Sequence, residues 1–517
     1  MFNASPLGFN LHDISYEALD YLRAMAAEND GVVNTFTQPA AVALGNLPPG
    51  IQFFDFDTVG RDIEIEVTPL TNRLPRRGPV GGVAMFWREI TAVNSGKTRL
   101  NVAEGLRGGT ISMATRDRMC KYAGLGLENA NTFESMYAAR GVANPRELAR
   151  LQTLKAVRMG EELINLYGNG GSLGVALGTP DAPVGVAAAT GVGETADSTA
   201  RTIKCVVVAL TGEGLELSSV ASGVVGTITR NNADGSISTF GGGSSLPSAA
   251  SADVVVAANE KITHTVADVP GALGYAWYTG VSGGTYRLAK ITTINQFIQY
   301  TDEGGAAQAS TAITADNSIN EYTYNGVMTI LQDSGSGAYY QSLDGAGWTA
   351  DSTGNIMELI EAFLYFYENY LISPTEVRVG PIEAYEITKT LLSGSAAAIY
   401  AKNLAKSDAV EGGFYVSSLL NPFTGNSVKL TLQPNMPAGY AVLMTWSVPY
   451  PIQNLGNIWE VLMRQPYYVI DWPLRTRKNE VGVYVDQGIK CEFPIAQGII
   501  KNVKSTSLRA HNSLLMA

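Results

Sequence analysis

Residues 144–167 read NPRELARLQTLKAVRMGEELINLY, and this stretch decides how the rest of the chain is interpreted. Asn144 is a favourable N-cap, Pro145 suits the first helical position, and Glu147 follows the cap at the spacing of a capping box. Gly168 then ends the pattern. We predict a helix of roughly 34 Å at about 1.5 Å per residue. A rod of this length needs a long element beside it.

Helical periodicity divides this stretch into two faces. Small and apolar residues share one face: Leu148, Ala149, Gln152, Ala156, Met159, Gly160, Leu163, Leu166 and Tyr167. Charged residues share the other: Glu147, Arg150, Lys155, Arg158, Glu161 and Glu162. We expect the C-terminal strands on the apolar face, with Ala156 and Gly160 leaving room for them. The charged face would meet solvent or a neighbouring copy, and Gly160→Glu would block assembly by spoiling the packing of the subunit itself.

Length and composition limit the possible functions. The chain has 517 residues, which suggests two to four domains, and only 16% of them are charged, against about 25% in typical soluble domains. Either other chains cover part of the surface or neutral residues do, and composition leaves both readings open. The net charge of -11 argues against a nucleic-acid reader, which needs a basic face.

No targeting or covalent framework is evident in the sequence. The three cysteines, Cys120, Cys205 and Cys491, are far apart and lack the spacing of a metal site or a disulfide scaffold. The N-terminus lacks the features of a signal peptide, and no apolar run reaches about 18 residues. We expect a protein that is made in the cytoplasm, without a membrane partner, and that stays there or leaves by a route other than secretion.

The first 118 residues show two blocks of opposite charge. Residues 1–60 read as an extended arm with an excess of acidic residues, whereas basic residues outnumber acidic ones in 61–118. Within the second block Gly82–Thr91 predicts a strand and Asn94–Gly96 its turn, which together indicate a long hairpin. One copy's arm would then meet the next copy's hairpin head to tail, unless both are ordinary solvated surfaces.

The character changes at about residue 184. Strand patterns separated by turns follow one another, and helical periodicity is absent; the strands are Arg201–Leu210, Gly223–Thr229, Ile262–Val266, Leu273–Tyr278, Tyr286–Thr293 and Gln296–Thr301. This pattern predicts an inserted antiparallel sandwich. Residues 272–302 resemble the middle strands of fibronectin type III domains, with Tyr275 and Trp277 placed like the buried aromatics of that family.

The remaining chain alternates helices and strands. We predict helices at Asn355–Leu371, with Asn355 and Glu358 as a capping pair, and at Pro381–Leu392, separated by a strand at Glu376–Val379. Further strands are predicted at Tyr440–Val448, Tyr467–Trp472, Val481–Val485, Ile489–Phe493 and Ile499–Val503. Together they indicate a compact α+β unit.

No group of residues predicts catalysis. Residues 170–174 match the pattern of a hydrolase nucleophile elbow but follow a helix instead of a strand. Gly96-Lys97-Thr98 lacks the first glycine of a phosphate-binding loop, and three isolated histidines do not form a metal site. We therefore expect no enzyme activity, no cofactor and no metal.

The order of these parts, more than any motif, points to a family. The informative stretches are TPLTNRLPRR (68–77), EELINLYGNG (161–170), GYAVLMTWSVPYPI (439–452) and RQPYYVIDWPLRTRKNEVGVYVDQGIKCEFPIAQGII (464–500). With them the chain resembles the major capsid proteins of tailed double-stranded DNA bacteriophages, the Hong Kong 97-like capsid family. The resemblance covers residues 1–183 and 306–517 and leaves the insertion outside.

The resemblance implies an α+β fold in five parts. These are an N-terminal arm (1–60), an extended hairpin or E-loop (61–118), a spine helix with the first part of a peripheral domain (119–183), the inserted Ig- or fibronectin-like sandwich (184–305), and an axial domain with returning peripheral strands (306–517). Arg73, Arg76, Arg77 and Arg88 would make subunit contacts, and Lys97 is the one lysine of the hairpin that a crosslink to a neighbour would use.

The implied function is structural. Copies would form pentamers and hexamers of an icosahedral virion shell around double-stranded DNA, without sequence-specific contacts, and the insertion would decorate the outside. Portal, scaffold or decoration proteins would be the other partners. Two alternatives stay open: an encapsulin-like compartment that encloses protein cargo, and an accessory module of an adhesin or carbohydrate-active enzyme, which would need a signal peptide.

Overall fold

The structure is a computed structural model that describes residues 67–92, 101–108, 114–139, 144–171, 176–191, 194, 196–197, 199–301, 308–351, 355–393, 416–449, 457–474 and 476–505. The chain divides into two compact units, residues 1–63 with 140–143 and residues 64–139 with 144–517. The first unit lies outside the described residues, as do the whole predicted arm (1–60), the predicted turn at 94–96 and Lys97. The account below concerns the second unit.

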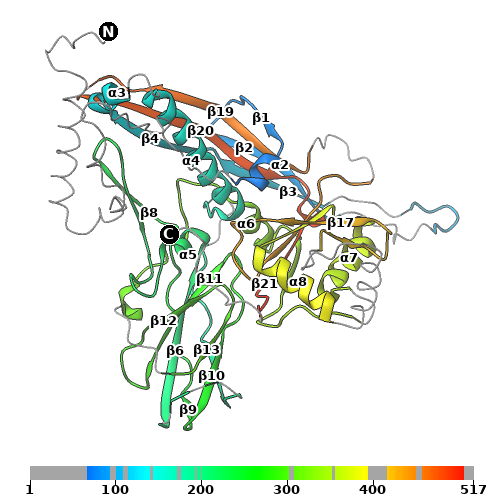
Figure 1. The fold of residues 1–517 in the computed structure, drawn as a ribbon. Coiled ribbons are helices and arrows are strands. Elements are labelled where there is room, and N and C mark those ends of the chain that lie inside the picture. The colour runs from blue at the N-terminus through cyan, green and yellow to red at the C-terminus, as the bar shows by residue number, and fades with distance from the viewer. Residues whose placement is uncertain are drawn as a thin grey trace, which may run out of the picture. The chain divides into compact units, whose positions relative to one another are not determined.

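Helix α4 (Pro145–Tyr167) confirms the predicted long helix, and Figure 1 shows it lying along a sheet. This 4-stranded sheet has the order β1 (Arg76–Arg77), β19 (Trp459–Asp471), β20 (Lys478–Cys491) and β4 (Ala123–Thr132). Val157 of α4 packs in one cluster with Val483 and Val485 of β20. The long partner of the helix is thus the pair β4 and β20, and β20 is one of the returning C-terminal strands.

The ends of α4 differ in detail from the prediction. The Asn144 side chain accepts a hydrogen bond from the Arg146 amide at 3.2 Å, as an N-cap does. Glu147 does not complete a capping box and instead accepts from Arg150 at 2.7 Å. Gly168 has φ -52, so it does not end the helix through a left-handed conformation. A Cβ at this position would lie 2.4 Å from the Tyr324 carbonyl oxygen, and only glycine permits that close approach.

The predicted charged face of α4 is wrong at its C-terminal end. Glu161 and Glu162 are 1% and 0% exposed, because polar groups from distant segments surround them. The expectation that Gly160 makes room for a closely packed strand is also wrong, since an added Cβ would meet nothing within 4 Å. The helix is covered on more sides than its periodicity indicates.

A two-stranded hairpin, β2 (Ala84–Ala92) with β3 (Ala114–Lys121), confirms the predicted strand near residue 82. We call these two strands the hairpin. The pairs within the described residues run from Ala84 with Lys121 to Ala92 with Ala114.

A second, 6-stranded sheet has the order β14, β21, β18, β15, β17, β16. Its strands are Tyr339–Ser342, Gly498–Lys501, Ala441–Met444, Glu376–Val379, Ser427–Leu432 and Ser418–Leu420, in that order. Its core includes side chains from α7 (Met357–Tyr370) and α8 (Pro381–Ser393), which confirms the two predicted helices and the strand between them.

Two details of the C-terminal half are corrected. Glu358 does not pair with Asn355 as a cap and instead accepts from the Thr349 amide at 3.1 Å. The two strands predicted at 481–485 and 489–493 form one continuous strand, β20. Gly488 lies inside this strand, where an added Cβ would lie 2.3 Å from Cε at the flexible end of the Met85 side chain.

Residues 184–299 contain three antiparallel sheets, two of which have more than two strands. One has the order β13 (Gln296–Gln299), β10 (Glu260–Thr265), β5 (Val184–Ala189). The other has the order β12 (Arg287–Thr292), β11 (Gly274–Val281), β6 (Arg201–Leu210), β9 (Val254–Val256). Tyr275 and Trp277 of β11 are fully buried, and Trp277 packs on Phe297 of the first sheet.

Two expectations for this region are wrong. A short helix, α5 (Gly212–Leu217), is present where no helix was expected, and Thr211 caps it by accepting from the Gly214 amide at 3.0 Å. The strand predicted at 223–229 begins only at β7 (Ile228–Asn231), which pairs with β8 (Ile237–Phe240). Gly223 instead closes a turn on Ser219 with φ +90, a conformation that favours glycine.

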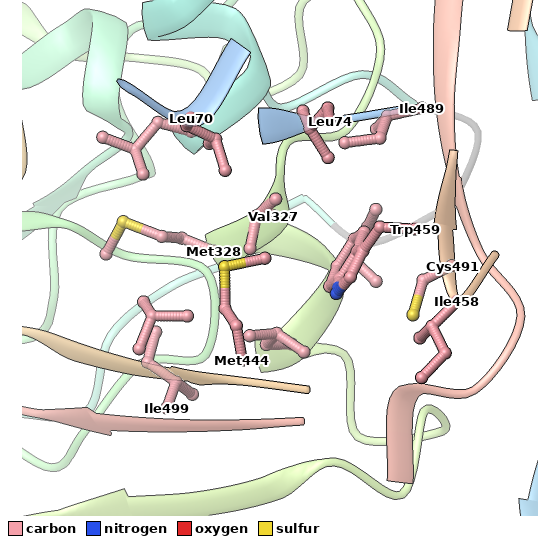
Figure 2. Packing of buried hydrophobic residues seen from close by; sticks show 14 of the residues in the cluster. Leu70, Leu74, Val327, Met328, Met444, Ile458, Trp459, Ile489, Cys491 and Ile499 are labelled. Atoms are coloured by element: carbon pink, nitrogen blue, oxygen red, sulfur yellow. The ribbon is translucent and has the colours of Figure 1, made fainter. Parts of the chain in front are cut away.

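One hydrophobic core joins the sheet that packs against α4 (β1, β19, β20 and β4), called the α4 sheet, to the 6-stranded sheet. Figure 2 shows Leu70 and Leu74, Val327 and Met328 of α6 (Val327–Gln332), and Trp459 packed together with strand residues from both sheets. Burial of these side chains stabilises the α4 sheet and the 6-stranded sheet as one body, at about 25 cal/mol per Å² of apolar surface. None of the described helices is long and apolar enough to cross a membrane.

Candidate assembly surface

Glu162, near the C-terminal end of α4, has a buried carboxylate that accepts hydrogen bonds from other segments of the same chain. It accepts hydrogen bonds from the backbone amides of Leu70 at 2.9 Å and Thr71 at 2.7 Å. These amides belong to the first turn of α2 (Pro69–Arg73), where no helical acceptor is available. The side-chain amide of Gln433 donates a third hydrogen bond at 2.5 Å. Glu162 therefore ties α2 and the end of β17 to α4.

Its neighbour Glu161 is the centre of a second buried network. It accepts from Arg76 of β1 at 2.7 Å, from Gln487 of β20 at 2.8 Å and from Tyr467 of β19. Tyr324 is linked to the same network through Gln487 at 2.8 Å. Burial, with Glu161 beside it, raises the pKa of Tyr467 to about 12, so this hydroxyl stays a donor at physiological pH.

The sequence gives little signal for these two acids. Glu161 and Glu162 stand in a helix between Met159 and Leu163, where a pair of acids ordinarily marks a solvent face. Their partners come from residues 70–76, 433, 467 and 487, which only the tertiary structure brings together. Buried carboxylates are tolerated when they are hydrogen-bonded or paired with a cation. Both acids accept several hydrogen bonds, and Glu161 also forms an ion pair with Arg76.

The inner face of the hairpin is fixed to its own chain. Trp87 donates from its indole nitrogen to the Cys491 carbonyl at 2.8 Å. Arg118 forms a buried ion pair with Glu89 at 2.7 Å and a second one with Asp333. Burial raises the pKa of Glu89, and the adjacent Arg118 opposes that rise. These contacts hold one side of the hairpin against β20 and the segment after α6.

The outer face of the hairpin carries apolar side chains that the chain leaves uncovered. Phe86 and Met119 are 75% and 39% exposed and lie directly opposite each other on the two strands. Arg88 pairs with Asp117 on the same face at 2.9 Å, where both side chains are exposed. Exposed apolar residues gathered on a protruding element mark a surface for association.

The structure separates the predicted contact arginines into two groups. Arg76 is held by Glu161 and stacks on the Tyr467 ring, so its guanidinium serves the interior. Arg73 lies over the Trp446 ring at 5.0 Å. Arg73, Arg77 and Arg88 all stay exposed, and Arg77 is only 3.6 Å from Glu460. Lys97 lies outside the described residues.

A groove of about 520 Å³ runs beside α4. We call it the groove; one wall consists of α4 and β4, with Gly160 and Gly126 among its residues, and the other of α5, β7 and β8. Arg230 of β7 spans it and donates to the Gly126 carbonyl at 3.0 Å. Phe240 of β8 and Tyr322 meet edge to face at its rim, with ring centroids 5.7 Å apart.

Two carboxylates of α5, Glu213 and Glu216, also line the groove. Glu213 accepts from the Asn320 amide at 2.8 Å, and Glu216 from the Tyr167 hydroxyl at 3.1 Å. No salt bridge to either acid is formed by the residues that the structure describes. Burial raises the pKa of Glu213 to about 7 and also raises the pKa of Glu216. These acids therefore lack the cationic partner that a desolvated carboxylate favours.

The part of the chain that the structure describes contains no cluster of histidine, cysteine and acidic side chains that could hold a metal ion. All three cysteines are buried, and burial raises the pKa of Cys205 and Cys491 far above the range in which thiolates form.

Comparisons with known proteins give the following results. No family of known proteins matches the sequence, and no characterised relative is found. Among solved structures, the chain is similar to one from the capsid of Myoviridae phage XM1, with 9% identity and a TM-score of 0.37 over 88% of this chain and 100% of that one. It is similar to a chain from the capsid of a native gene transfer agent particle, with 10% identity and a TM-score of 0.36 over 90% of this chain and 99% of that one. An encapsulin from Synechococcus elongatus has 12% identity and a TM-score of 0.21, over 33% of this chain and 55% of that one. Because these TM-scores are low, the functional argument rests on the contacts of the chain itself.

Proposed function

We propose that this chain is a structural protein that assembles into the shell of a tailed-phage or related particle. The observation that carries the proposal is the two-sided hairpin: its inner face is fixed by Trp87 and Arg118, and its outer face presents Phe86 and Met119 to solvent. A hairpin used only inside one subunit would have no reason to display an apolar outer face. Such a face fits contact with a second copy.

The α4 sheet provides the rigid support that such a contact requires. Buried networks at Glu161 and Glu162 join α4 to β1, β19, β20 and the 6-stranded sheet. A subunit braced in this way transmits contact forces without deforming. We propose that copies associate head to tail into pentamers and hexamers of an icosahedral shell around double-stranded DNA, with Arg73, Arg77 and Arg88 at subunit contacts. Residues 184–305 would be an Ig- or fibronectin-like insertion that decorates the outside.

The test is assembly of the purified full-length chain. Sedimentation and negative-stain images are expected to show rings or closed shells for the native sequence. Phe86→Asp is expected to abolish them without changing the midpoint of denaturant unfolding, because Phe86 is 75% exposed. The matched control is Val281→Asp, at an exposed position of β11, which is expected to assemble normally.

Two outcomes would contradict this function. One is a native chain that stays monomeric at every concentration. The other concerns the contents of particles purified from producing cells: protein cargo in place of DNA would favour a compartment of the encapsulin kind.

A further inference from the structure

Strand β5 (Val184–Ala189) forms an open edge of the insertion. It pairs with β10 on one side and is the last strand of its sheet among the residues that the structure describes. Its sequence, VGVAAA, contains no charged residue, and Val184 and Val186 are 61% and 59% exposed. An uncharged and exposed strand at the edge of a sheet is a template for pairing with another strand.

The hydrogen bonds of β10 show which residues of β5 point to the open edge. In an antiparallel pair alternate residues bond to the partner strand, and the residues between them point away from it. Just after β5, the Thr190 amide donates to the Asn259 carbonyl at 3.4 Å. By this alternation the even-numbered residues of β5 bond to β10. The odd-numbered residues direct their N–H and C=O groups to the open edge: Gly185, Ala187 and Ala189.

The other edges of the two larger sheets of the insertion are covered or short. On the β12 side, the Leu288 amide donates to the Gln308 carbonyl at 3.0 Å. On the β13 side, Lys504 of the core donates to Gln296 at 3.1 Å. Strand β9 has only 3 residues. Covering and shortening protect sheet edges against association, and within the described residues β5 has neither protection.

We propose that β5 pairs with β5 of a second copy of this chain, antiparallel and about a two-fold axis, so that the two 3-stranded sheets join into one. The inference rests on the proposed function, because a shell holds many copies side by side. It gives the insertion a role in joining copies, in addition to decoration.

The pairing is self-complementary when Ala187 lies opposite its counterpart in the second copy. In this register the outward N–H and C=O groups of Gly185 face those of Ala189 in the second copy. On the outer face Val186 lies opposite Ala188, so a larger side chain meets a smaller one. No like charges meet, since the strand has none. Every residue that points to the open edge thereby gains a backbone partner.

A second copy suits this edge better than an unrelated protein does. Recognition of a different protein typically uses aromatic or charged side chains, whereas β5 presents small apolar ones. A pair of strands about 20 Å long is too small for a stable dimer by itself, because specific interfaces bury roughly 1,200–2,000 Å². The contact therefore depends on copies that other contacts already hold together, as in a shell.

The symmetry of this contact assigns its place in the assembly. A two-fold contact is isologous and closes after two copies, whereas head-to-tail contacts continue around a ring. Adjacent copies of a pentamer or hexamer are related by rotations other than a two-fold. Pairing through β5 therefore joins copies that belong to neighbouring rings.

Paired cysteines test the register directly. When assembled particles of the full-length chain carrying Val186→Cys and Ala188→Cys are oxidised, most of the chain is expected to form disulfide-linked dimers. The matched control, Val184→Cys with Val186→Cys, has the same spacing on the same face but no opposing thiol. It should give about tenfold fewer dimers, because cysteines whose Cα atoms are more than about 7 Å apart are not bridged. The three native cysteines are buried.

Proline at the edge provides an independent measurement. Ala189→Pro removes an N–H that points to the open edge and is not bonded to β10, so the melting temperature of the subunit should stay unchanged. Combined with Val186→Cys and Ala188→Cys, it should lower the yield of linked dimers about fivefold or more, because both strands lose a hydrogen bond. Ala189→Ser keeps the N–H and should leave the yield unchanged.

The outcomes distinguish the inference from the function. Shells that form normally but give no more dimers with the test pair of cysteines than with the control pair would overturn the inference and leave the function standing. A ladder of larger linked oligomers, or a link to an unrelated protein, would also overturn it, because a two-fold contact closes after two copies. A native chain that never forms shells would overturn the function. Linked dimers from such a chain would still support the pairing, and their absence would overturn both.

Discussion

Two pairs of carboxylates, both close to helix α4, differ in how the chain treats them. Glu161 and Glu162 are fully buried and accept hydrogen bonds from several segments, and Glu161 also forms an ion pair with Arg76. Glu213 and Glu216 line an open groove, each with one neutral donor. Each acid of the first pair has several partners within the subunit, whereas each acid of the second is partly dehydrated and forms no ion pair with the residues that the structure describes.

The two pairs differ in whether their hydrogen-bond partners lie within the subunit or a cation of another chain is still to be supplied. A buried acid with all its partners contributes to the subunit, because removing it leaves buried donors without acceptors. An acid without a cation at a groove costs the isolated subunit stability and is retained only if another contact uses it.

Glu162→Ala should cause the largest loss of stability. The amides of Leu70 and Thr71 and the side chain of Gln433 would lose their acceptor inside the core. We expect the free energy of unfolding to fall by roughly 3–5 kcal/mol. Denaturant titration followed by circular dichroism measures this, with Glu368→Ala as the control. A change below about 1 kcal/mol, within the range of ordinary surface substitutions, would show that the first pair is not structural.

Gly168→Ala should cost about 1–3 kcal/mol, the typical penalty for overpacking. Its Cβ would approach the Tyr324 carbonyl oxygen to 2.4 Å, and the backbone at the end of α4 would have to move. The melting temperature of the subunit measures the loss. If the variant melts like the native chain, the close approach at the helix end is not a constraint.

Glu213→Gln should stabilise the isolated subunit while weakening assembly. Burial raises the pKa of this carboxyl from 4.5 to about 7 in the folded state, so the folded chain holds the proton more tightly than the unfolded chain. Its ionisation therefore lowers stability progressively as pH rises from about 4.5 to about 7. The glutamine variant should lose that part of the pH dependence and gain roughly 1–3 kcal/mol at pH 8. Unfolding curves at pH 5 and pH 8 decide this; an unchanged pH dependence would contradict the assignment.

Gly160→Ala should have the smallest effect, a gain of about 0.5–1 kcal/mol from replacing glycine inside a helix. An added Cβ here meets nothing within 4 Å, in contrast to Gly168 on the same helix. The expectation that Gly160→Glu spoils the packing of the subunit is therefore revised. That variant would add an acid to a groove already lined by Glu161, Glu213 and Glu216, and it should keep its fold while weakening assembly. A subunit that loses stability would contradict this.

Much of the fold was predictable where local pattern and tertiary structure agree. The capped run 145–167 became α4, the alternating or continuous apolar runs became β6, β15 and β21, and residues 381–393 became α8. The local pattern predicts the type and place of these elements but not their burial, since Glu161 and Glu162 of α4 and all four residues of β15 are buried. The prediction failed at residues 481–493, where two short strands were expected but one strand, β20, pairs with β19 and β4.

The candidate site was predictable only in part. The sequence identified the hairpin and its arginines from charge and strand pattern, but Arg76 serves the interior and Arg88 the surface. Nothing local distinguishes them, because the difference depends on whether Glu161 or Asp117 lies opposite. The groove was missed, since α5 has too few residues to show helical periodicity and its acids face α4 only in the folded chain.

The sequence by itself determined the long helix, because capping residues and periodicity act within a few residues of each other along the chain. Only the tertiary structure decided which acids of that helix region are buried and which line a groove. Burial of a charge depends on partners that lie far away in sequence, such as Gln487 for Glu161 and Tyr167 for Glu216. The free energy of these contacts belongs to the assembled core, and no local pattern encodes it.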